Sequence, residues 1–278
     1  MHDQHKLSLA FLTVQGCPPI DHVKVAAKAG YDAAGLRLMA PHGLELAHSI
    51  VGNAALLREI NAAAAGLGVS LLDGEVFTLL PDTDVRSWAP VIETAAELAM
   101  PFMQITCEDP ELSRAADNLG LLADQAARLH IDIAIEFMHW RAAATIEDAA
   151  KLAKTSGRGN VGILLDALHL SRSGGSPASV AAIQRELILY LQLCDAASVQ
   201  PTDDAGRIAE ARSARMMPGQ GALWLRELMA ALRSDIAISV ETPHAGDAGL
   251  SYLQRAQRAM TATRAFLDGL KAPTSSEG

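Results

Sequence analysis

Short apolar runs alternate with longer helix-forming segments eight times along the 278-residue chain. Each run has the length and aliphatic content of a strand that is buried on both faces. We expect strands at 7–14, 31–39, 69–76, 102–106, 131–137, 161–165, 187–194 and 236–240. We expect helices at 20–29, 53–67, 84–99, 111–129, 145–155, 176–185, 223–233 and 250–270. Eight such units predict an α/β fold, a single-domain (β/α)8 TIM barrel, because an open doubly wound sheet usually needs only about five or six strands.

The composition shows no break that would divide the chain into two domains. Half of the residues are hydrophobic and only 4% are aromatic, so the core is expected to consist of Ala, Leu, Ile and Val. A barrel of this kind typically takes about 250 residues. We therefore predict one barrel domain over residues 1–271 and a disordered tail at 272–278, where small and polar residues follow the last helix.

The net charge bears on possible binding partners, and the cysteines bear on the compartment of the protein. The net charge is −9, and no cluster of Lys and Arg supplies the local positive charge that nucleic acid requires. No apolar stretch reaches the ~18 residues of a membrane span, and the amino terminus lacks the pattern of a signal peptide. Three widely spaced cysteines are typical of a reducing compartment. We expect a cytoplasmic protein with a small-molecule substrate, without a nucleic-acid or membrane partner, and with a homo-oligomer left open.

The last four expected strands carry polar groups at or just after their carboxyl ends. These groups are Glu136, Asp166, Gln192 and Glu241. Active sites of (β/α)8 barrels lie where the carboxyl ends of the strands meet, so three carboxylates and an amide oxygen are expected to converge. Three anions at low dielectric repel one another, so either some are protonated or a cation binds among them. An all-oxygen ligand set favours Mg²⁺ or Mn²⁺ over Zn²⁺. The alternative interpretation is a set of separate helix caps and salt bridges, with Asp166 as one of the caps.

Three further residues near these acids are candidates for contact with a substrate. His139 follows Glu136 by three residues and could donate to a substrate oxygen, or pack beside Trp140. His169 lies three residues after Asp166 and could orient that carboxylate or bind substrate. Arg215 lies in the expected loop 195–221, where its guanidinium could clamp a carboxylate or phosphate, or simply be solvated.

Other charged residues also have two interpretations. Glu75 ends a strand and Glu108 follows another, so each could line the pocket or cap the next helix. Arg37 lies inside an apolar strand, where an unpaired charge is costly, so we expect it to pair with one of these acids. Arg172 precedes the Gly174-Gly175 pair and could approach a substrate, or belong to a turn of the chain.

The order of these motifs resembles a known family. The acid that ends strand 131–137, the Asp166-x-x-His169 motif, the Gln192-x-x-Asp195 motif and Val-Glu241 follow the pattern of the xylose-isomerase-like barrels. These barrels are also called the sugar phosphate isomerase/epimerase superfamily. The segment Arg215-Met-Met-Pro-Gly-Gln-Gly is similar to the family's Arg-x-x-Pro-Gly-x-Gly loop. The similarity extends over most of the chain, and the second half is its specific part.

The resemblance implies that Glu136, Asp166, Gln192 and Glu241 hold one divalent metal ion. In this family the first and last of these acids can also face the substrate as base and acid. Most members have His where this chain has Gln192, and the order Glu, Asp, Gln, Glu resembles bacterial 3-dehydroshikimate dehydratases in particular. Replacing imidazole by a neutral amide oxygen favours Mg²⁺ or Mn²⁺ over Zn²⁺.

Together with the convergent acids, the resemblance implies a metal-dependent isomerase or epimerase that acts on a small polyhydroxy carbonyl substrate through a metal-stabilised enediolate. The expected catalytic residues are Glu136, Glu241 and His169, and the expected substrate-binding residues are His139, Arg215, Glu75 and Arg172. Two alternatives stay open: a lyase that resembles 3-dehydroshikimate dehydratase, and a barrel that binds metal or sugar with weakened catalysis. No Gly-x-Gly-x-x-Gly or Gly-x-Ser-x-Gly motif supports a nucleotide cofactor or a serine hydrolase.

Overall fold

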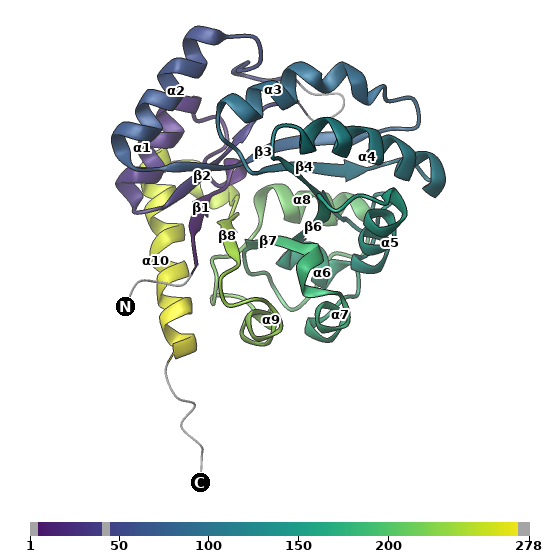
Figure 1. The fold of residues 1–278 in the computed structure, drawn as a ribbon. Helices are drawn as coiled ribbons and strands as arrows, with labels where there is room; N and C mark the ends of the chain where they lie inside the picture. Colours follow the sequence, from purple (N-terminus) through teal and green to yellow (C-terminus); the bar gives the residue numbers. More distant parts are fainter. Residues whose placement is uncertain (1–4, 41–44, 272–278) are drawn as a thin grey trace.

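A computed structural model describes residues 5–40 and 45–271 of the chain. Within these ranges eight parallel strands form a closed barrel in sequence order, with β8 paired to β1 (Figure 1). The strands are β1 (Leu7–Leu9), β2 (Ala33–Arg37), β3 (Ser70–Leu79), β4 (Phe102–Cys107), β5 (Asp132–Glu136), β6 (Val161–Asp166), β7 (Ile188–Leu193) and β8 (Ala237–Val240). The predicted single-domain (β/α)8 barrel is confirmed.

Helices surround the barrel and connect its strands (Figure 1). They are α1 (Pro19–Ala29), α2 (Ala54–Leu67), α3 (Ala89–Glu97), α4 (Leu112–Ala127), α5 (Ile146–Ser156), α6 (Ala167–Arg172), α7 (Pro177–Ala182), α8 (Asp204–Ser213), α9 (Leu225–Ala231) and α10 (Tyr252–Lys271). The last helix, α10, packs against α1 and so closes the ring of helices beside β1 and β8.

Local signals in the sequence set the ends of several helices. The Asn53 side chain accepts a hydrogen bond from the Leu56 amide at the start of α2. Thr145 and Asp148 form a reciprocal capping box at the start of α5. Gly157 ends α5 with a φ of 67°, a left-handed conformation that glycine adopts without steric cost. These caps satisfy amide and carbonyl groups that would otherwise lack partners.

The barrel interior is filled directly beneath the predicted site. Side chains alternate between the two faces of a strand, so the residues two positions before Glu136, Asp166 and Gln192 also point inward. These residues are Ala134, Leu164 and Tyr190, and all three belong to one buried apolar cluster. The Tyr190 ring stacks on Phe102 with ring centroids 5.0 Å apart. This layer fills the barrel below the carboxylates, and the pocket lies on the side of the carboxyl ends of the strands.

The structure differs from the predicted elements at three places. The expected strand 7–14 is shorter: β1 ends at Leu9, and a 3₁₀ helix, η1, covers Phe11–Val14. The Thr13 hydroxyl of η1 donates to the Val240 carbonyl at 2.9 Å, which ties the turn to β8. Two helices, α6 and α8, were not predicted. Helix α6 spans only six residues, and α8 is largely polar and exposed, so neither has a strong apolar period.

The remaining expectations on the chain concern its ends and its cysteines. The predicted disordered tail at 272–278 lies outside the described residues. Cys17, Cys107 and Cys194 are buried and carry free thiols. Over the described part of the chain, none of the helices combines the length and the apolar character that crossing a membrane requires.

Candidate metal and substrate site

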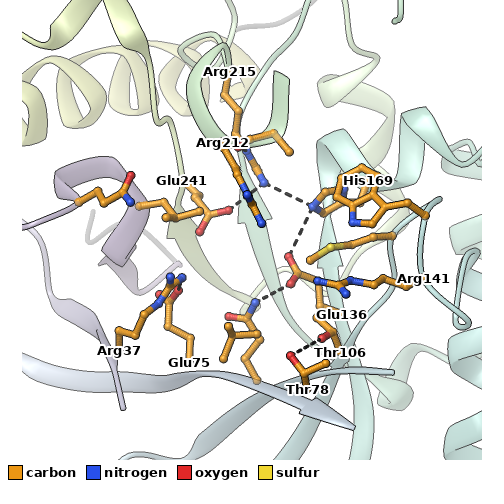
Figure 2. A pocket seen from close by; sticks show the side chains of 17 residues that line it. Arg37, Glu75, Thr78, Thr106, Glu136, Arg141, His169, Arg212, Arg215 and Glu241 are labelled. Atoms are coloured by element: carbon orange, nitrogen blue, oxygen red, sulfur yellow. Dashed lines mark hydrogen bonds and ion pairs between the residues drawn. The ribbon is translucent and has the colours of Figure 1, made fainter. Parts of the chain in front are cut away.

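A pocket lies at the carboxyl ends of the strands (Figure 2). Glu136, Glu241 and Glu75 line it from three different strands or strand ends. Neighbouring strands place the predicted ligands in register: Asp166 of β6 pairs with Gln192 of β7. The four predicted metal ligands are at most 2% exposed. The structure therefore brings these residues together beneath the pocket.

Asp166 combines the two interpretations that the sequence left open. Its Oδ1 accepts a hydrogen bond from the His169 amide at 2.9 Å, so Asp166 is the N-cap of α6. Its Oδ2 faces the site and accepts from Arg215. One carboxylate thus starts a helix and supplies an oxygen to the buried cluster, because β6 passes directly into α6.

Three side chains are close enough together to bind one metal ion. Glu136, Asp166 and His169 each offer a ligand atom, and these atoms lie within 4.8 Å of one another. The His169 Nε2 atom is 3.7 Å from Glu136 Oε1. The sequence placed His169 beside the metal as a catalytic group, whereas this geometry also makes it a candidate ligand.

The Gln192 amide carries a further oxygen into the same space. The amide orientation that satisfies its polar atoms has the nitrogen donating to Glu136 Oε1 and Asp166 Oδ2 at 3.1 Å each. A divalent cation bound by these carboxylates would require the opposite orientation, in which the amide oxygen turns toward the ion. Gln192 is therefore placed to hold the two acids together without a metal, or to add one oxygen ligand to a bound metal.

Arg215 is a buried cation at the centre of the cluster. Its Nη1 donates to Asp166 Oδ2 at 2.5 Å, and its Nη2 lies 2.9 Å from Glu241 Oε2. Its Nε donates to the Ala211 carbonyl at 2.9 Å. Arg215 lines the pocket, as its predicted substrate role requires, but two acids already occupy its guanidinium. One arginine offsets only part of the charge of three buried carboxyl groups.

Burial and neighbouring charges shift the pKa values of the three acids in different directions. Burial raises the pKa of Glu136 well above its usual range, with repulsion from Glu241 and Asp166 adding to the effect. Burial also raises the pKa of Glu241, to about 8, against the opposing effect of Arg215. Burial acts in the same direction on Asp166, but Arg215 and His169 outweigh it and the net pKa is lowered. Carboxyl groups with raised pKa values can accept and return protons near neutral pH.

His169 is held as a neutral imidazole. Burial is the main cause that lowers its pKa to about 4. The Trp140 ring packs edge-on against it, with ring centroids 5.3 Å apart. A neutral imidazole can bind a metal ion or donate one hydrogen bond to a substrate oxygen.

Glu75 reaches the pocket together with Arg37. The Arg37 Nη2 atom donates to Glu75 Oε2 at 2.6 Å, which confirms the expectation that Arg37 pairs with an acid. The Arg37 guanidinium also lies 4.5 Å from the centre of the Phe11 ring. Both charged residues line the pocket opposite the β5–β6 side of the barrel.

Two predicted substrate ligands lie outside the pocket lining. Arg172 is buried, donates to Glu210 at 2.8 and 2.6 Å, and also donates to the Ala197 carbonyl. It therefore joins α6 to α8 rather than reaching the pocket, and its prediction as a substrate ligand is corrected. His139 is half-exposed, with its Nε2 3.9 Å from Asp204 Oδ1, while its neighbours Met138 and Trp140 line the pocket.

Several residues that line the pocket were not predicted from the sequence. Gln104 of β4 donates through Nε2 to Glu136 Oε2 at 2.6 Å, and Thr106 of the same strand faces Thr78. The signal for both was a polar residue at every second position in Phe-Met-Gln-Ile-Thr-Cys, which indicates an inward polar face. Arg141 and Arg212 also line the pocket, from segments that the sequence left without structure.

A comparison with protein families decides the assignment. The model of the xylose isomerase-like TIM barrel family matches residues 23–267. The chain belongs to the xylose isomerase-like TIM barrel family. The family resemblance that the order of motifs indicated is confirmed.

Individual relatives differ in their activities. A 3-dehydroshikimate dehydratase of Pseudomonas aeruginosa is 29% identical over 157 residues, which is 56% of this chain and only 23% of that protein. The structure of the IolI protein with a bound zinc atom has a TM-score of 0.79 at 21% identity, covering 95% of this chain and 99% of that one. The structure of D-psicose 3-epimerase with D-tagatose from Clostridium cellulolyticum H10 has a TM-score of 0.71 at 14% identity, covering 94% and 99%. The two structural likenesses show the fold.

Proposed function

We propose that the chain is a divalent-metal-dependent isomerase or epimerase that moves a proton at the carbon beside a carbonyl group of a small polyhydroxylated substrate. The observation that carries this proposal is the meeting of Glu136, Asp166 and His169, whose possible ligand atoms lie within 4.8 Å of one another beside an open pocket. Such a cluster stores repulsion unless a cation binds within it. Glu136 in this cluster and Glu241 next to it both have raised pKa values, and these two glutamates would supply the proton acceptor and donor.

The metal would be held by Glu136, Asp166, Gln192 and Glu241, with His169 as a nitrogen donor close to the first two. When bound, the metal would polarise the carbonyl oxygen and so acidify the neighbouring C–H group. The oxygen-rich set supports Mg²⁺ or Mn²⁺. The imidazole of His169 and the zinc in the IolI protein make Zn²⁺ the rival choice.

The chain's own residues would handle the proton. Glu136 is fixed by the hydrogen bond that Gln104 donates to its Oε2. Its Oε1 is the oxygen nearest to His169 and Gln192, so a proton taken at Oε1 would enter a buried site that excludes bulk water. Glu241, fixed by Arg215, would serve as the second acid. Without a bound metal, burial raises the pKa of both glutamates, that of Glu241 to about 8, which favours proton uptake by these two groups.

The destination of the proton decides the reaction. Return to the opposite face of the same carbon gives an epimer, and return to the neighbouring carbon gives an isomer. Loss of a hydroxyl from the next carbon gives dehydration instead. A dehydratase is therefore the second candidate, and the specific observation that favours it is the 29% identity with the 3-dehydroshikimate dehydratase of Pseudomonas aeruginosa.

One experiment tests the proposed function and separates its alternatives. Purified protein is analysed for bound metal and then incubated with a panel of ketoses, aldoses and shikimate-type compounds in deuterated water. The expected result is bound metal with deuterium incorporation beside the carbonyl, or loss of water from one compound, which Glu136→Gln abolishes. Bound metal without exchange or dehydration supports the metal-binding barrel. Absence of both metal and chemistry contradicts the proposal.

A further inference from the structure

Two arginines line the pocket from opposite segments. Arg141 lies in the loop after β5, and Arg212 lies in the last turn of α8. Figure 2 shows both guanidinium groups directed toward the open space near Glu136 and Glu241. Neither residue has a role predicted from the sequence, and neither takes part in the proposed proton transfer.

The two arginines are short of negative partners. Arg212 is exposed to the pocket and makes no ion pair with any residue in the described ranges. Arg141 pairs with Glu108, yet its Nε is buried and lacks a hydrogen-bond partner among the described residues. The other two arginines of the pocket, Arg37 and Arg215, each form an ion pair with an acid of the site.

The two positive charges also act on each other. Burial is the main cause that lowers the pKa of Arg141, and the charge of Arg212 adds to it. Two like charges at the same pocket mouth raise the free energy of the empty site. An anion placed between them removes this repulsion and accepts hydrogen bonds from both guanidinium groups, whose planar forks suit carboxylate and phosphate oxygens.

We propose that Arg141 and Arg212 form an anion-binding subsite that holds a carboxylate or phosphate group of the substrate over Glu136 and Glu241. This inference rests on the proposed function, because it assigns the substrate class of the same pocket. The substrate is then a small carbonyl compound that carries one anionic group, rather than a neutral sugar. The anionic group anchors the molecule at the mouth while its carbonyl end reaches the buried acids.

The test compares anions with neutral compounds of the same skeleton. Calorimetric titration measures the binding of shikimate against methyl shikimate, and of D-fructose 6-phosphate against D-fructose. The proteins are the purified wild type, Arg212→Gln, Arg141→Gln and the control Arg185→Gln. Arg185 is exposed and precedes β7, at the opposite end of the barrel, so its variant loses the same charge away from the pocket.

The expected result is that at least one anion binds about tenfold more tightly than its neutral counterpart. Arg212→Gln and Arg141→Gln should each remove most of this preference, while Arg185→Gln should keep it. Tighter binding of shikimate than of methyl shikimate identifies a carboxylate subsite. Tighter binding of D-fructose 6-phosphate than of D-fructose identifies a phosphate subsite. Arg212 is exposed, so its variant is expected to fold even if Arg141→Gln, which leaves Glu108 unpaired, does not.

Three results would overturn the subsite: no binding of either anion, equal binding of anion and neutral compound, or a preference that survives both pocket substitutions. The last result would mean that the anion binds elsewhere, for example on the metal. Metal content and proton exchange are measured separately. Metal binding and exchange without an anion preference overturn only the subsite, and an arginine-dependent preference without metal overturns only the proposed function.

Discussion

The Arg215 guanidinium and the Asp166 carboxylate form an ion pair of 2.5 Å in which both side chains are fully buried. This pair holds the pKa of Asp166 down although burial alone would raise it. Glu136 has no such partner, and its pKa is raised. The site therefore contains one acid held as an anion beside another that burial favours in its protonated form.

Replacing Asp166 should reveal its two structural roles. Asp166→Ala removes both the cap of α6 and the partner of Arg215, so we expect the free energy of unfolding to fall by about 3–5 kcal/mol. Asp166→Asn keeps a cap, so its loss should be about 1 kcal/mol smaller. Urea unfolding of the metal-free proteins measures both values. Equal losses in the two variants would show that the cap contributes nothing.

Gln104 should act on the reaction by positioning Glu136. Gln104→Leu removes the donor that lies 2.6 Å from Glu136 Oε2, which should slow proton exchange about tenfold, since a hydrogen bond to a carboxylate contributes roughly 1.5–3 kcal/mol. Its pH profile should also move to higher pH, because the lost bond stabilised the ionised form. Thr106→Val, at the next inward position of β4, is the matched control. Unchanged rate and pH profile in Gln104→Leu would exclude the positioning role.

Arg172 should contribute to stability rather than to substrate binding. Arg172→Gln breaks the buried pair with Glu210 that joins α6 to α8, so we expect a loss of about 3 kcal/mol in the free energy of unfolding. The double variant with Glu210→Gln should recover part of that loss, because no buried charge stays unpaired. KM should be nearly unchanged at a temperature where the variant is folded. A large rise in KM with unchanged stability would restore Arg172 as a substrate ligand.

His22 should make the protein sensitive to acid. It is buried, its Nε2 contacts the Leu9 carbonyl at 3.1 Å, and burial lowers its pKa to about 4. In the unfolded chain, the His22 imidazole binds a proton with its ordinary pKa near 6.5. The stability that comes from burying a neutral His22 is therefore fully present above pH 6.5 and is lost as the pH falls toward 4. Between pH 7.5 and 5 the wild type should lose about 2 kcal/mol more stability than His22→Gln. Urea unfolding at the two pH values measures these changes, and equal losses of stability in the wild type and in His22→Gln would contradict this assignment.

The sequence predicted those parts of the site that follow directly from strand ends. An apolar run followed by an acid locates Glu136, Asp166 and Glu241, and parallel strands bring such ends together. Arg172 and His139 were assigned from closeness along the chain to these acids, which does not give the direction of a side chain. Arg172 faces α8, a polar helix that has too weak an apolar period to be predicted.

Residues that reach the pocket from other directions could not be assigned from local pattern. Gln104 needs the barrel register to show that it faces Glu136, although the alternation in β4 indicates its inward face. Arg212 reaches the pocket only because α8 folds back over the site, and Arg141 only because the loop after β5 bends. Such contacts depend on the tertiary path of loops, which single-sequence patterns do not encode.

Metal binding tests the central claim most directly. Manganese titration followed by electron paramagnetic resonance, with Mg²⁺ and Zn²⁺ as competitors, counts the ions bound by the wild type and by the double variant Glu136→Gln, Asp166→Asn. If the buried oxygens form the metal site, the wild type binds one ion per chain and the double variant, while still folded by circular dichroism, binds none. Equal binding by the two proteins, or a wild type that binds none of the three metals, would contradict the account.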